Sequence, residues 1–217
     1  MACQAAGGEG AEAYRAAYVD ANRALLIAAA RGRARALVYS GSTGVFGQRD
    51  GSDVDEDAPP APASPSARVL AEAEVLVRDG AGGGLRTAVV RLSGLYGPGR
   101  AGLIDRVRSG KHALGPDDGT WMNFCHRDDA VALVLAVLER GEPGAVYHGS
   151  DATPARRREV VTWVAERLGI PAPRTETAVP GPDRRILSEW TRRRLEVELR
   201  YPSFRVGFEA LLRPPAP

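Results

Sequence analysis

Three glycines follow a run of residues that is typical of a buried strand, and their spacing is one that phosphate binding uses. Gly41, Gly44 and Gly47 stand in the pattern Gly-x-x-Gly-x-x-Gly directly after the apolar residues 36–40. Such glycines let the backbone approach a pyrophosphate where a turn opens a helix. Residues 48–60, however, are rich in Asp, Gly and Pro and do not suit a helix. We therefore expect that these glycines do not form a dinucleotide-binding turn.

The other reactive side chains do not suggest a metal site or a disulfide framework. His126 precedes Asp128 and Asp129, but the three would supply too few ligands for a metal ion. The two aspartates begin a predicted helix, where carboxylates cap free N–H groups. Cys3 and Cys125 are too few for a network of disulfides, so we interpret both as free thiols of a cytoplasmic protein.

The charged residues argue against nucleic acid and membrane partners. The formal net charge is +2, and Lys111 is the only lysine among 29 basic residues. The arginine runs at residues 156–158 and 192–194 lack interleaved aromatic residues, so we interpret them as solvated helix faces. No apolar run approaches the roughly 18 residues of a membrane span. The opening residues lack the pattern of a signal peptide. We expect a cytoplasmic protein that binds neither nucleic acid nor membrane.

The elements that position these residues alternate between strands and helices. Short apolar runs predict buried strands at residues 36–40, 87–92 and 145–148. Helical spacing predicts helices at residues 12–31, 67–78, 128–140, 156–168 and 184–194. In one of these helices the residues expected to face inward are Val131, Leu133, Val134 and Val137.

The segments between these elements are predicted from their turn-forming residues. Residues 51–66 and 94–99 are expected to be loops because Gly, Pro, Asp and Ser dominate them. A short apolar tail follows residues 201–204. Strands alternating with helices of this length predict an α/β fold with parallel strands and crossover helices.

Four ordered segments carry a resemblance to a known family. Residues 38–47, Val-Tyr-Ser-Gly-Ser-Thr-Gly-Val-Phe-Gly, resemble the strand end of extended short-chain dehydrogenases of the NAD-dependent epimerase/dehydratase family. Residues 91–99 resemble that family's Arg-x-x-Asn-Val-Tyr-Gly-Pro-Gly loop, and residues 123–129 its Phe-Ile-His-Val-Asp-Asp segment. Residues 144–150 resemble its last sheet strand. The similarity spans about residues 12 to 170, and residues 201–205 resemble the atypical branch of the family.

The resemblance implies a fold, a cofactor class and a set of site residues. The expected architecture is the later part of a doubly wound, Rossmann-type sheet at residues 1–150, with a small C-terminal lobe at residues 151–217. The implied cofactor is NAD or NADP, and the implied partner is a small-molecule substrate. Ser42 stands where the family has a catalytic Ser or Thr, and a serine that only bonds its own turn is the equal alternative. The other implied contacts are Ser40 and Gly41 for the cofactor, and Thr43, Tyr96, Asn123 and His126 for the substrate.

The chain departs from the family at the positions that do the chemistry. The family uses a tyrosine as acid and base, and a lysine four residues later lowers the pKa of that tyrosine. By register with the Ala-Glu-Ala-Glu run these positions fall on Ser66 and Leu70, and no Tyr-x-x-x-Lys sequence exists in the chain. Gly94 replaces the asparagine that contacts substrate in the family. We expect altered or lost catalysis, or alternatively a non-catalytic member that senses a ligand or binds a partner.

The N-terminal strands of the family's fold have no counterpart that we recognise in this sequence. The strands that carry the glycine fingerprint and the ribose-binding acid come first in the family and hold most of the dinucleotide. We therefore expect a chain truncated at its N-terminus, in which binding of NAD or NADP is doubtful. The strand at residues 36–40 would then lack a neighbour, which predicts self-association through an exposed apolar edge.

Overall fold

The centre of the protein is a small parallel sheet. The computed structural model describes residues 11–116, 118–177 and 181–213. Strands β1 (Ala36–Ser42), β3 (Arg86–Leu92) and β7 (Ala145–Gly149) lie in the order β1-β3-β7. All neighbouring pairs are parallel. The three predicted strands and the α/β class are confirmed, and each strand is slightly longer than its apolar run.

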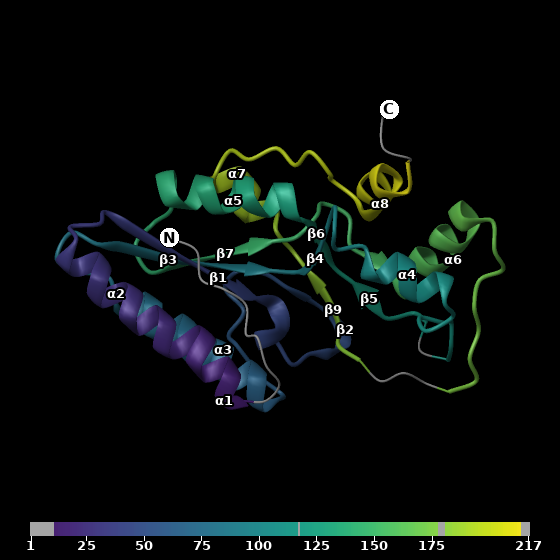
Figure 1. The fold of residues 1–217 in the computed structure, drawn as a ribbon, viewed down its shortest axis with the longest axis horizontal. Coiled ribbons are helices and arrows are strands. Elements are labelled where there is room, and N and C mark those ends of the chain that lie inside the picture. The colour runs from purple at the N-terminus through teal and green to yellow at the C-terminus, as the bar shows by residue number, and fades with distance from the viewer. Residues whose placement is uncertain (1–10, 117, 178–180, 214–217) are drawn as a thin grey trace.

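Helices cover both faces of this sheet (Figure 1). Helix α2 (Ala21–Arg31), preceded by α1 (Ala11–Tyr14) and a π-helical segment (η1, Arg15–Asp20), lies with α3 (Pro65–Asp79) on one face. Helix α5 (Arg127–Arg140) covers the other face together with the short α7 (Glu189–Arg194). No helix of the described residues has both the length and the apolar character that crossing a bilayer requires.

Local sequence explains where these helices begin and which side they bury. Ser64 precedes α3 and accepts a hydrogen bond from the Ala67 N–H at 3.1 Å, and Pro65 suits the first turn because its missing N–H needs no partner. In α5, Leu133 and Val137 are buried as predicted. Val131, predicted to face inward, is 58% exposed. That prediction was wrong because the residue falls outside the stripe that faces the sheet.

Short strand pairs surround the carboxyl end of the sheet. Strand β2 (Arg49–Val54) pairs in parallel with β9 (Asp183–Ile186), and β4 (Gly94–Tyr96) pairs in parallel with β6 (Phe124–His126). Strand β5 (Trp121–Met122) is antiparallel to β8 (Ala155–Arg156). These pairs tie the later part of the chain to the first part.

These pairs correct three predictions. Residues 51–66 and 94–99 were expected to be loops, yet their first residues lie in β2 and β4. The helix expected at residues 184–194 is instead strand β9 followed by α7. Polar residues obscured β2 and β9, and the glycine-rich composition obscured β4, because pairing with a distant strand overrides weak local propensity.

Three helices form the core of the C-terminal lobe with residues from the middle of the chain. Helix α4 (Gly102–Arg108), α6 (Arg157–Leu168) and α8 (Phe204–Leu212) lie together beyond the carboxyl end of the sheet (Figure 1). The expected apolar tail is helix α8, which Ser203 caps through the Val206 N–H. Tyr96 and Phe124 join the same hydrophobic core. A domain boundary at residue 150 stays a prediction.

Strand β1 is an edge of the sheet. Within the described residues it pairs with β3 alone, as predicted for the strand at residues 36–40. The outer edge of such a strand is a place where another chain can add to the sheet.

We expect the isolated chain to self-associate through β1, and sedimentation velocity across a concentration series measures this. Ser40→Lys places a charge on the exposed edge and should shift the distribution toward monomer. Val75→Lys changes an exposed apolar residue on α3 and should leave the association unchanged. A wild-type chain that stays monomeric and melts cooperatively would contradict the expectation.

Candidate active site

A cleft of about 880 Å³ opens at the carboxyl ends of β1 and β3. This is where open parallel sheets bind ligands, because the loops that follow the strands diverge there. Strand β1 and its following turn form one wall, and β4, β5, β6 and the C-terminal lobe form the other. The cleft brings together six of the seven predicted site residues, namely Ser40, Gly41, Ser42, Thr43, Tyr96 and Asn123.

Ser42 ends strand β1 and turns the chain into the cleft wall. Its Oγ accepts a hydrogen bond from the Gly44 N–H at 3.0 Å, which caps the short 3₁₀ turn η2 (Thr43–Val45). A hydroxyl that accepts one bond still has its own proton to donate. The geometry is therefore compatible with both interpretations of Ser42, the local cap and the substrate contact. The turn leads into β2, so the glycine motif opens no long helix.

Two other predicted contacts are engaged in holding the wall together. The Thr43 hydroxyl lies 3.5 Å from the Leu92 carbonyl oxygen, and Thr43 is nearly buried. The Asn123 amide donates to the Arg184 carbonyl at 2.9 Å and accepts from the Ile186 N–H at 2.8 Å. Asn123 therefore fastens β9 beside β6, and one N–H and one lone pair of its amide remain for a substrate.

Tyr96 reaches the cleft wall through its ring, while its hydroxyl points into the C-terminal lobe. The hydroxyl is buried without a hydrogen-bond partner among the described residues. Burial raises the pKa of Tyr96 far above its ordinary value. A Cβ at Gly207 of α8 would lie only 1.8 Å from the Tyr96 Oη, so the helix approaches the ring here because it carries no side chain. Tyr96 is therefore placed as a packing residue and not as an acid or base.

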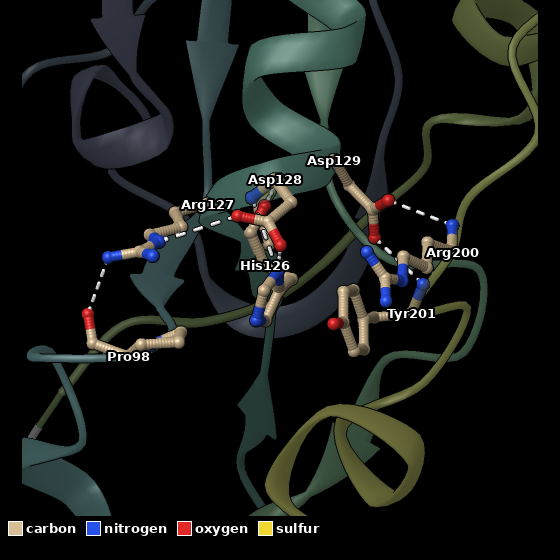
Figure 2. Close-up of polar contacts among 8 residues, drawn as sticks. Pro98, His126, Arg127, Asp128, Asp129, Arg200 and Tyr201 are labelled. Carbon is tan, nitrogen blue, oxygen red and sulfur yellow. Dashed lines mark hydrogen bonds and ion pairs between the residues drawn. The ribbon is translucent and has the colours of Figure 1, made fainter. Parts of the chain in front are cut away.

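His126 is the predicted site residue that does not line the cleft. Figure 2 shows it at the start of α5, where its Nδ1 accepts from the Asp128 N–H at 3.2 Å. Its ring stacks on Tyr201 with the centroids 3.7 Å apart. Burial lowers the pKa of His126. The residue acts as the helix cap, and its substrate role stays a prediction.

The cap by His126 corrects the role expected for the two aspartates. Asp129 accepts from the backbone N–H groups of Arg200 and Tyr201 at 2.8 and 3.0 Å (Figure 2). Asp128 lies on the surface beside Arg127. Asp129 therefore anchors the segment that precedes α8. Among the described residues, no three His, Cys, Asp or Glu side chains gather as a possible metal site.

The positions aligned with the family's tyrosine and lysine lie on the first turns of α3. Leu70 lines the cleft, and the Ser66 hydroxyl lies 3.1 Å from the Ser64 hydroxyl at the helix start. The chain also fits tightly around Gly94, where a Cβ would lie 2.9 Å from the Asn123 carbonyl oxygen. The cleft therefore has an apolar side chain where a lysine would stand, and an asparagine at residue 94 would require the Asn123 backbone to shift.

Sequence reasoning missed the charge of the cleft. Its described lining contains no Asp, Glu, Lys or His, and its charged residues are Arg100, Arg106, Arg157 and Arg184. An available signal was the pair Arg184-Arg185, since adjacent residues of a strand face opposite sides. The helix predicted for residues 184–194 concealed this alternation.

Comparison with known proteins places the fold among NAD-dependent enzymes. A family model described as the NAD dependent epimerase/dehydratase family matches residues 2–148. Protein YeeZ of Escherichia coli (strain K12) is 30% identical over 156 residues, which covers 72% of this chain and 54% of YeeZ. A 3-diazoavenalumate denitrifying reductase of a Streptomyces species is 37% identical over 141 residues, or 59% of this chain and 45% of the reductase.

A solved structure shows the same architecture. DesIV, a dTDP-glucose 4,6-dehydratase of Streptomyces venezuelae with NAD bound, superimposes with a TM-score of 0.81 at 22% identity. The match covers 96% of this chain and 70% of DesIV. The sheet and its helices therefore have a Rossmann-type architecture. The chain spans about half the length of the curated relatives that it matches.

Proposed function

Because the chain belongs to the NAD-dependent epimerase/dehydratase family, we propose that it forms the substrate-binding part of an oxidoreductase-like protein with altered catalysis. The observation that carries this proposal is the cleft, in which Ser42 and Leu70 both line the wall. The serine hydroxyl retains a proton to donate to a substrate oxygen. The leucine cannot lower the pKa of a neighbouring acid as a lysine would.

The described residues supply only one side of a dinucleotide site. NAD or NADP would supply hydride chemistry in a family member of this kind, and Ser40 and Gly41 are the proposed contacts to it. The glycine turn after β1 leads into a strand and presents no long helix to a pyrophosphate. A Cβ at Gly41 would lie 3.1 Å from a Glu74 oxygen, so the side on which another residue would carry its side chain is already filled by α3. These residues do not fit the whole cofactor, and no step is derived through it.

We expect the chain by itself not to bind NADH or NADPH with useful affinity. Isothermal titration calorimetry with each dinucleotide measures this, and a dissociation constant at or below the low micromolar range would overturn the expectation. Such a result would also restore Gly41, Gly44 and Gly47 as candidates for the pyrophosphate turn.

The proposed alteration of catalysis has its own test, which is substrate turnover. dTDP-glucose is a suitable probe because it appears in the name of the structural neighbour. We expect dTDP-glucose to be recovered unchanged, as measured by anion-exchange chromatography, when the chain is mixed with dTDP-glucose and NAD. Robust turnover that Ser42→Ala abolishes would show that another group has replaced the tyrosine as acid and base.

A non-catalytic binding protein is the second candidate, favoured by the absence of a carboxylate, lysine or histidine from the described cleft lining. The two candidates differ in what Ser42 does. A binding protein should keep its ligand when Ser42 is changed to Ala and show no turnover at any pH. An enzyme should lose rate more than affinity.

A further inference from the structure

Two tyrosines that no sequence motif singles out line the same cleft as Ser42. Tyr14 ends α1 and Tyr18 lies four residues later in η1, so the two are neighbours on one side of the helix. Their ring centroids are 5.4 Å apart, and both residues line the cleft. Leu70 of α3 lines it as well. Tyr14, Tyr18 and Leu70 are referred to below as the tyrosine wall.

The tyrosine wall is held by the core behind it and by an ion pair beside it. Tyr14 and Tyr18 pack against the hydrophobic cluster that contains Tyr39 of β1. The rings of Tyr18 and Tyr39 meet edge to face, with their centroids 6.4 Å apart. The Arg15 guanidinium donates to the Glu72 carboxylate at 2.6 Å, which joins η1 to α3. The aromatic rings therefore form a fixed series that runs from the sheet to the cleft.

The side of the cleft that carries the tyrosine wall has no charge. None of the described lining residues from α1, η1, α3 and β1 is charged, and the four arginines of the lining come from the loop after β4, from α4, from α6 and from β9. Arg184 of β9 is already engaged with the turn that follows Ser42, because its Nη2 donates to the Thr43 carbonyl oxygen at 2.7 Å. A ligand group between Ser42 and the tyrosine wall therefore meets aromatic, apolar and hydroxyl side chains.

Partly exposed aromatic rings have a preferred partner, which is another ring. Aromatic pairs adopt tilted or edge-to-face arrangements and gain stabilisation beyond the apolar area that they bury. The tyrosine wall already shows this packing, with interplanar angles of 46° between Tyr14 and Tyr18 and 66° between Tyr18 and Tyr39. A ring of a bound molecule would continue the series into the cleft. Small-molecule sites commonly combine such a wall with a few polar groups that orient the ligand.

We propose that the tyrosine wall binds an aromatic ring of the small molecule whose oxygen atom Ser42 contacts. The ligand class is then an aromatic carbonyl compound, with its ring on the tyrosine wall and its oxygen toward the serine hydroxyl. The inference rests on the proposed function for the role of Ser42 and deepens it by naming the chemical class of the ligand.

Two neutral ketones with the same number of heavy atoms separate ring chemistry from apolar burial. Acetophenone carries an aromatic ring, whereas cyclohexyl methyl ketone carries a saturated ring that is no less apolar, so burial alone does not favour acetophenone. Titration of each ketone, followed by saturation-transfer NMR, measures dissociation constants even when binding is weak. We expect the wild-type chain to bind acetophenone more tightly by about 2- to 12-fold, the range that one aromatic pair contributes.

Variants of the tyrosine wall locate the preference. Tyr18→Leu and Tyr14→Leu should each reduce the preference for acetophenone, and Tyr18→Phe should retain it because the ring is kept. Trp190→Leu is the matched control, because Trp190 is an exposed aromatic residue outside the described lining of the cleft. Its preference should equal that of the wild type. If Tyr18→Leu does not fold, Tyr14→Leu decides.

The outcomes separate this inference from the proposed function. Equal affinity for the two ketones overturns the inference, as does absence of binding or a preference that survives both leucine variants. Tighter binding of nicotinamide than of acetophenone also overturns it, because the tyrosine wall would then take the ring of a cofactor. Ser42→Ala tests the proposed function instead. Weaker binding of both ketones by a similar factor supports the serine contact, whereas unchanged affinities contradict that contact and leave the aromatic preference interpretable.

Discussion

A Glu74→Gln variant is expected to unfold with a free energy about 3–5 kcal/mol below that of the wild type, because it leaves Arg91 buried without a counter-charge. Both side chains are almost inaccessible, at 3% and 2% exposure. Arg91 donates to the two carboxylate oxygens at 2.9–3.2 Å and to the Ala58 carbonyl at 3.3 Å. The pair joins β3 to α3 and to the segment after β2. Whole domains are stable by only about 5–15 kcal/mol, so this loss is large.

Glu72→Gln is the matched control on the same helix. Glu72 binds Arg15, yet both side chains are more than two-fifths exposed. Exposed pairs contribute about 0–1 kcal/mol, so this variant should be close to the wild type. Urea denaturation at pH 7 measures both. Equal losses in the two variants would contradict the importance of burial.

A double variant tests whether the buried pair acts as a unit. Both side chains of the pair are removed from water, and the cost of that desolvation offsets much of the attraction between the two charges. Replacing both with apolar residues, as in Glu74→Leu with Arg91→Met, should therefore cost less than Glu74→Gln alone. A loss equal to the sum of the single variants would show that the two residues contribute independently.

An Asp151→Asn variant is expected to be more stable than the wild type at pH 8, by as much as roughly 4 kcal/mol, and equally stable near pH 4. Asp151 follows β7 and is 3% exposed. The backbone N–H groups of Thr153 and Phe204 lie near the carboxylate, but neither forms a hydrogen bond of normal geometry with it. Burial raises the pKa of Asp151 from 3.8 to about 7, although the backbone N–H groups of Thr153 and Phe204 oppose the rise.

The direction of the effect follows from proton binding. The pKa of Asp151 in the folded state lies above its unfolded value, so the folded state binds more protons between about pH 4 and pH 7. The free energy of unfolding therefore falls as the pH rises through this window. His112 and His148 act in the opposite direction, because burial lowers each pKa to about 4. The difference between wild type and variant isolates the contribution of Asp151.

Urea unfolding of both proteins at pH 4, 6 and 8 measures this difference. Asp105→Asn on α4 is a suitable control because the Asp105 side chain is 64% exposed. The control should track the wild type at every pH. A stability difference between Asp151→Asn and wild type that does not change with pH would show that the carboxyl is already ionised in the folded protein at pH 4.

The main sheet was predictable from sequence because each of its strands contains a short run of apolar residues near turn residues. The short strands around the cleft were not predictable from the sequence. Strand β9 reads Asp-Arg-Arg-Ile, and its pairing with β2 depends on residues more than 100 positions away. Helix α8 was missed because its nine residues were interpreted as a tail, although Ser203 stands at the position of a cap.

The cleft was predictable from motifs, and its charge was not. Ser42, Thr43, Tyr96 and Asn123 meet in the cleft, as the order of the family segments implied. Sequence could not show that the Asn123 amide is occupied by backbone groups, because its partners come from β9. For the same reason Arg184, which reaches the Thr43 carbonyl oxygen from β9, had no visible role.

The hydrogen bond between Arg184 and Thr43 has a consequence for the order of folding. It joins residues 141 positions apart, and the β2–β9 pair spans a similar separation. Closing such a long loop is slow, so contacts of this kind form after the local ones. During synthesis the central sheet can assemble while the residues of β9 are still to be made. The cleft should therefore form last. An intermediate with a formed sheet and an incomplete cleft would expose apolar residues to solvent and would be prone to aggregate.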